Sequence, residues 1–102
     1  MKLTEYEKNC LFRGTVLRIK GSYPFTEDKV DFMICEFPTA KPDVLGLALF
    51  CVSGYEAGHF EYLFPSEAGV PGTVSVDRDW LIKNWNKKIY LGCDVSDVEI
   101  KV

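Results

Sequence analysis

Apolar and polar residues alternate along much of the chain, a pattern that predicts β-strands. From residue 16 to residue 20, two basic residues alternate with Leu17 and Ile19, as in a strand with one buried face. Segments 30–37, 58–64 and 95–102 show the same character. Within 58–64, strict alternation would place three rings on one face: Phe60, Tyr62 and Phe64.

Segment 44–52 is almost continuously apolar, and its nine residues suit either a short buried helix or a buried strand. Gly46, together with Pro42 before the segment and Ser53 and Gly54 after it, favours a buried central strand. Residues 53–57 would then connect this strand to the next one as a hairpin.

Helical spacing replaces the alternation from residue 76 to residue 86. Ser75 or Asp77 can cap the first turn, and Gly92 marks the exit. Tryptophan is enriched at binding sites, but a stripe on a single helix over a sheet favours a core role. The stripe repeats at intervals of three and four residues and consists of Trp80, Leu81, Asn84 and Trp85.

These elements predict an α+β fold, with a mainly antiparallel β-sheet of about five strands packed against one C-terminal helix. The chain has 102 residues, of which 47% are apolar. This length supports one modest core, so we expect residues 1–102 to form a single domain.

The charge balance and the apolar runs exclude several classes of protein. The formal net charge is −3 and the pI is about 5.1, so the basic face of a DNA- or RNA-binding protein is not expected. The longest apolar run has nine residues, whereas a membrane helix needs roughly 20. The first residues lack the apolar stretch of a signal peptide. We therefore expect a cytosolic protein without direct nucleic-acid or membrane contact.

No residue pattern indicates a catalytic, metal or cofactor site. No two of the four cysteines are closer than sixteen residues, so a CxxC pair for zinc is absent. We interpret the cysteines as structural thiols, with a disulfide, a metal role or a catalytic thiol as the alternatives. The single histidine, His59, is expected to be an exposed strand residue, and Glu36 a solvated residue at a strand end. Phosphate-binding loops are absent as well, and we expect neither an enzyme nor a cofactor.

Negative charge is concentrated in one part of the chain. Residues 43–79 hold six acidic residues against Arg78 alone, a net charge of −5, whereas the segments on either side are each +1. Together with Tyr55 and Tyr62, this acidic segment would suit a basic protein partner, because complementary charge accelerates association. The alternative is a solvated outer face with no partner.

Two segments, taken in order, resemble a known family. The first is Val-Ser-Gly-Tyr-Glu-Ala-Gly at residues 52–58, which leads into a strand that ends at Pro65. The second is Trp-Leu-Ile-Lys-Asn-Trp-Asn at residues 80–86, followed by Tyr90, Cys93 and a closing strand near residues 98–100. In this order they are similar to immunity protein family 45 of bacterial polymorphic toxin systems. The resemblance covers roughly the C-terminal half, and the N-terminal half agrees in being strand-rich.

This resemblance implies neutralisation of a toxin instead of turnover of a substrate. Such proteins act in the cytosol and bind a cognate toxin domain, whose active site they occlude or distort. Many of these toxins are nucleases with basic clefts, which the acidic segment could cover. The alternative is a small non-enzymatic protein-binding or homodimeric scaffold domain unrelated to toxins. The candidate partner-binding residues, chosen by expected exposure, are Tyr55, Glu56, Glu61 and Glu67.

Overall fold

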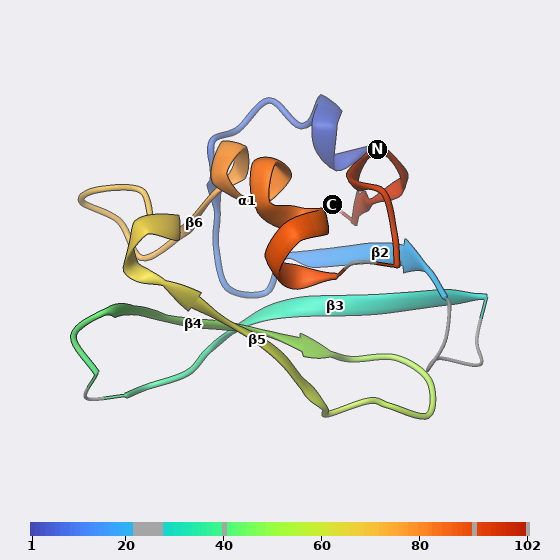
Figure 1. Cartoon of the computed structure of the whole chain (residues 1–102), viewed down its shortest axis with the longest axis horizontal. Coiled ribbons are helices and arrows are strands. Elements are labelled where there is room, and N and C mark those ends of the chain that lie inside the picture. The colour runs from blue at the N-terminus through green and yellow to red at the C-terminus, as the bar shows by residue number, and fades with distance from the viewer. Residues whose placement is uncertain (22–27, 40, 91, 102) are drawn as a thin grey trace.

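Five strands form one antiparallel sheet in the order β5-β4-β3-β2-β7 (Figure 1). The computed structural model describes residues 1–21, 28–39, 41–90 and 92–101. It confirms the α+β fold, the mainly antiparallel sheet and the hairpin between the third and fourth predicted strands. The strands are β2 (Val16–Lys20), β3 (Lys29–Glu36), β4 (Val44–Cys51), β5 (Phe60–Pro65) and β7 (Glu99–Lys101).

The pairing of β4 with β5 is irregular, whereas β2 and β3 pair without interruption. Gly46, with a φ of 83°, lies in the first of two register shifts, and this left-handed conformation favours glycine. At the second shift, Leu49 pairs with Tyr62 and Phe50 pairs with Phe60. Glu61 is therefore the extra residue of a β-bulge.

This bulge makes the expectation of strict alternation in segment 58–64 wrong. The ring of Phe60 packs 5.7 Å from Phe50, between ring centroids, whereas the Tyr62 and Phe64 rings contact each other. Phe64 also contacts Trp80 of the helix. An extra residue shifts the alternation by one, so side chains before the bulge point to the opposite face of the sheet. Phe60 therefore lies on the face opposite to Phe64.

A helical segment near the C-terminus covers one face of the sheet (Figure 1). It consists of α1 (Arg78–Asn84) and a π-helical turn, η3 (Trp85–Ile89). The carboxylate of Asp77 accepts a hydrogen bond from the backbone N–H of Asp79 at 2.9 Å, which confirms Asp77 as the cap. Ser75, the other candidate cap, is fully buried. The helix ends at Ile89, earlier than the exit expected at Gly92.

The ends of two predicted elements differ from the structure. The helix predicted at 76–86 begins two residues later, because Val76 and Asp77 form β6 (Val76–Asp77), which pairs with β1 (Cys10–Leu11). The strand predicted at 95–102 is shorter, because a 3-10 turn, η4 (Val95–Asp97), precedes β7; Val102 lies outside the described residues. Two further 3-10 turns are η1 (Leu3–Glu5) and η2 (Ser66–Ala68).

The core lies between the sheet and the helical segment. Trp85 is fully buried there, as the aromatic stripe predicts, and Trp80 packs partly buried at the edge of the core. The sheet contributes a layer of fully or almost fully buried side chains: Leu17, Ile19, Val30, Phe32, Ile34, Leu47, Leu49, Cys51, Phe64 and Ile100.

Candidate protein-binding surface

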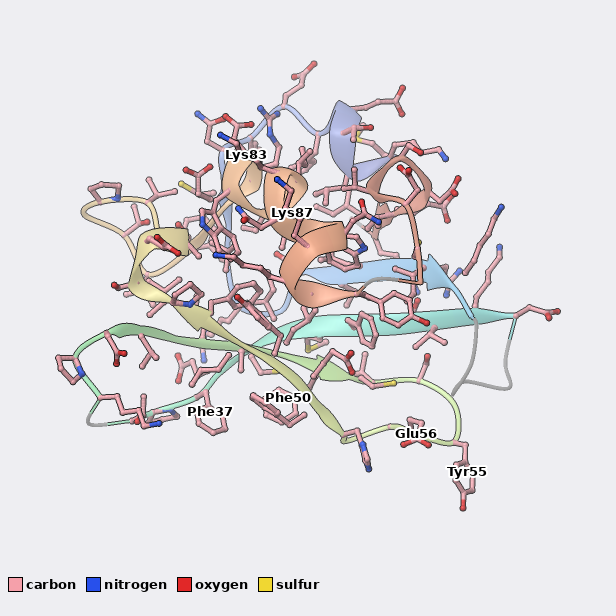
Figure 2. All side chains as sticks on the ribbon, in the orientation of Figure 1. Phe37, Phe50, Tyr55, Glu56, Lys83 and Lys87 are labelled. Atoms are coloured by element: carbon pink, nitrogen blue, oxygen red, sulfur yellow. The ribbon has the colours of Figure 1, made fainter. Side chains whose placement is uncertain are left out.

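The hairpin between β4 and β5 presents two of the predicted contact residues at one end of the molecule (Figure 2). Tyr55 is 90% exposed. Glu56 lies next to it, and its Oε2 is 3.4 Å from Nδ1 of His59. His59 is exposed, as expected. Gly58 turns the chain with a φ of 93° before β5 begins.

Glu61 follows Phe60 at the start of β5 and is partly buried. Burial raises the pKa of the Glu61 carboxyl, and the nearby His59 opposes that shift. His59 thus interacts with both Glu56 and Glu61. The structure brings these two predicted acids together at one end of β5.

Glu67, the fourth predicted contact residue, belongs to a different region. It is exposed in η2, at the other end of β5, and its Oε1 is 3.7 Å from Nζ of Lys88. Burial raises the pKa of the Tyr62 hydroxyl, and the charge of Glu67 adds to the shift. Glu67 is therefore linked to the helical side of the molecule through Lys88, whose Nζ lies over the Trp80 ring.

Three phenylalanines gather on the face of the sheet that the helix leaves open, and the sequence reasoning missed them. Phe37 and Phe50 point away from α1 in Figure 2. The ring of Phe60 lies 5.6 Å from Phe37 and 5.7 Å from Phe50, and Phe60 is 47% exposed. No signal in the sequence alone would have grouped them, because the bulge at Glu61 determines where Phe60 points. We call Phe37, Phe50 and Phe60 the phenylalanine cluster.

The other half of the open face is charged. Arg18 donates hydrogen bonds of 2.8 and 3.1 Å to the two carboxylate oxygens of Asp31, and Nζ of Lys101 is 3.5 Å from the same carboxylate. The hydrogen bond from Arg18 lowers the pKa of Asp31, although burial opposes the shift. The open face thus has a charged half over β2 and β7 and an aromatic half over β4 and β5.

The groups that could support chemistry are dispersed. All four cysteines are free thiols, and burial raises the pKa of the Cys35 and Cys93 thiols. Glu36 is exposed, as expected, and its Oε1 lies 3.2 Å from Nη1 of Arg13. In the described ranges, no group of three histidine, cysteine or acidic side chains could hold a metal ion. Among the same residues, no helix is long and apolar enough to cross a membrane.

The model of one protein family matches the chain. This family is described as Immunity protein 45, and the match runs from residue 3 to residue 100. It includes the N-terminal strands as well as the two segments that carry the resemblance. No curated protein and no solved structure matches the chain.

Proposed function

This chain belongs to the Immunity protein 45 family, and we propose that it binds a cognate bacterial toxin in the cytoplasm and blocks the toxin's active site. The family supports a role in toxin immunity in general. The observation that carries the proposal is the extent of the match, residues 3–100, because it involves the whole folded unit and not one motif.

The proposed mechanism is occlusion by a protein–protein interface. A stable interface buries about 1,200–2,000 Å² in total, about half of it on each partner, and one face of a domain of 102 residues can supply that half. The proposal involves no catalytic step by this protein. Its work is to cover the toxin's substrate cleft and to stay bound.

A toxin with a basic cleft, as nucleases have, suits the charge of this protein. Residues 43–79 carry a net charge of −5, and Glu56 and Glu61, both partly buried, lie at the β4–β5 hairpin. Tyr55, Glu56 and Glu61 would meet the toxin there, and Glu67 would extend the contact toward η2. Complementary charge of this kind raises the association rate and selects against wrong partners.

Co-expression tests the proposed function directly. The gene immediately upstream of this one supplies the candidate toxin, which is expressed in a sensitive host, with or without this protein. Restored growth supports immunity. If cells die although both proteins are present and folded, the proposed function is wrong.

Association kinetics then test the contribution of the acidic residues. The double charge reversal Glu56→Lys and Glu61→Lys should slow association with the toxin about tenfold at low salt and much less at high salt. The matched control is the double reversal Glu5→Lys and Glu7→Lys, which changes two exposed acidic residues outside the acidic segment. If the double variant associates as fast as wild type at every salt concentration, the hairpin does not steer the toxin.

A further inference from the structure

The open face of the sheet carries an apolar row that crosses four strands. Val16 pairs with Met33, Met33 pairs with Phe50, and Phe50 pairs with Phe60. Residues paired in this way share a face of the sheet. The solvated face of an antiparallel sheet normally carries polar residues, so an apolar row there calls for an explanation.

The bulge at Glu61 enlarges this apolar surface. Without the extra residue, Phe60 would point to the same face as Tyr62 and Phe64, toward the helix. With it, the Phe60 ring joins those of Phe37 and Phe50, at centroid distances of 5.6 and 5.7 Å. Bulges are common where a side chain is redirected for a functional purpose. Here the backbone irregularity exposes an aromatic ring instead of burying it.

A shallow hollow adjoins the phenylalanine cluster. Its volume is about 370 Å³, and Met33, Cys35, Arg13 and Glu36 contribute to its lining. Met33, which lines the hollow, lies opposite Phe50 in the β3–β4 pair. Such a hollow could receive one side chain of a partner, as the anchor pockets of protein interfaces do.

No described element of the chain covers this face (Figure 1). The helical segment lies on the other side of the sheet, and so do the exposed lysines Lys83 and Lys87 (Figure 2). The β4–β5 hairpin borders the cluster and carries Glu56 and Glu61. An apolar centre with an acidic border is the arrangement of a protein interface with a polar rim.

We propose that the open face of β3, β4 and β5, centred on Phe50 and Phe60, is the surface that holds the toxin. The matching region of the toxin would present an apolar centre flanked by lysine or arginine residues. This inference rests on the proposed function and adds to it: the acidic hairpin steers the toxin, and the phenylalanine cluster retains it.

Charge complementarity favours a basic partner over a second copy of this chain. Each copy carries a net charge of −3, and the hairpin beside the cluster is itself acidic. Two copies that met through this face would bring like charges closer. The charged half of the face, with Arg18, Asp31 and Lys101 already joined, would also add little to a symmetric apolar contact.

Serine substitutions at Phe50 and Phe60, made singly, test this surface. The candidate toxin from the upstream gene is the probe, and calorimetry or surface plasmon resonance measures its Kd. We expect each substitution to raise Kd about 30-fold, mainly through faster dissociation, because centrally placed aromatic residues dominate interface energies. Val74→Ser changes an exposed apolar residue on the segment before β6, and Lys83→Glu changes an exposed residue of α1. We expect less than a threefold change in Kd from either control.

Measurements on the wild-type protein separate the outcomes. If it does not bind the toxin, the proposed function fails. If it binds and the folded serine variants bind equally well, the function stands and the inferred surface is wrong. Amide hydrogen exchange of the wild-type complex needs no variant: slowed exchange in β4 and β5 supports the surface, and unchanged exchange there refutes it. A wild-type dimer in sedimentation that Phe60→Ser converts to a monomer would assign the face to a second copy instead.

Discussion

The two faces of the sheet are built from alternate residues of the same strands, yet they differ in what covers them. The inner face is closed by the helical segment, and its central residues Phe32 and Leu49 are fully buried. On the outer face, Phe60 keeps 47% of its surface exposed. The inner face therefore supplies stability, because burial of apolar surface drives folding. The outer face retains apolar surface that folding does not use and that a partner can bury.

A second difference lies in regularity. The residues of the inner face follow the alternation of their strands, whereas the outer face depends on a bulge at Glu61 to display Phe60. Regular alternation is what a sequence needs in order to build a core. The irregularity exposes Phe60 on the outer face. The inner face thus requires regular alternation to form the core, whereas the outer face requires a particular side chain to be exposed.

The largest expected effect is a loss of stability caused by a substitution on the inner face. Trp85→Ala should lower the free energy of unfolding by about 3–5 kcal/mol, because the indole is fully buried and its loss leaves a cavity. Phe50→Ala, which truncates a partly exposed ring of the outer face, should cost about 1 kcal/mol. Chemical denaturation of the purified variants measures both losses. Equal losses would mean that the outer face contributes to the core after all.

Trp85→Phe provides the control for this pair. The Nε1–H of Trp85 is buried and has no hydrogen-bond partner among the described residues. Phenylalanine removes this unsatisfied donor, which is favourable, and loses a small part of the buried apolar volume, which is unfavourable. The two effects partly offset each other. We expect a loss of about 1 kcal/mol, well below that of alanine. A loss as large as that of alanine would show that the indole N–H is satisfied in solution.

The strand β2 was predictable from its own alternation, whereas features created by pairing were not. The bounds of β2 follow from Leu17 and Ile19 alone, because one strand's alternation records which face is buried. The two-residue pair of β1 and β6 leaves no periodic signal, since tertiary contacts create it. The bulge at Glu61 depends on how β5 meets Phe50 of another strand, which the local sequence does not record.

The candidate site was predictable to a similar degree. The turn chemistry around Gly54 and Gly58 predicts a hairpin, and the hairpin exposes Tyr55. Glu67 was grouped with these residues because it is close in sequence and acidic, but β5 carries it to the other end of the sheet. The phenylalanine cluster assembles from three separate segments, so the strand order had to be known first.

An intermediate effect comes from the charged half of the outer face. Asp31→Asn should lower the free energy of unfolding by about 1 kcal/mol at pH 7, because it removes the paired carboxylate from Arg18. The pKa of Asp31 is lowered in the folded state. Its stabilisation is therefore complete above the unfolded pKa of about 4 and is lost as the pH falls through the lower, folded pKa.

Denaturation at several pH values measures this dependence. The difference between wild type and Asp31→Asn should shrink as the pH falls below about 4. Glu36→Gln is the matched control, because the Arg13–Glu36 pair is more exposed and such pairs contribute little. A constant difference from pH 7 to pH 2 would show that the asparagine acts through packing and not through charge.

The smallest effect concerns the border of the aromatic half. Burial raises the pKa of Glu61, so its charged form is less favourable in the folded protein than in the unfolded chain. This penalty is absent below the unfolded pKa of about 4.3 and grows as the pH rises through the folded pKa. Glu61→Gln should therefore stabilise the free protein by a few tenths of a kcal/mol at pH 7 and leave it unchanged at pH 3. The same variant should bind a basic toxin more weakly at pH 7, because it lacks the Glu61 carboxylate. That carboxylate is unfavourable for folding but would pair with a basic side chain of the toxin. A variant that gains stability and loses affinity would place Glu61 in the interface, whereas a gain in stability with unchanged affinity would restrict its role to the fold.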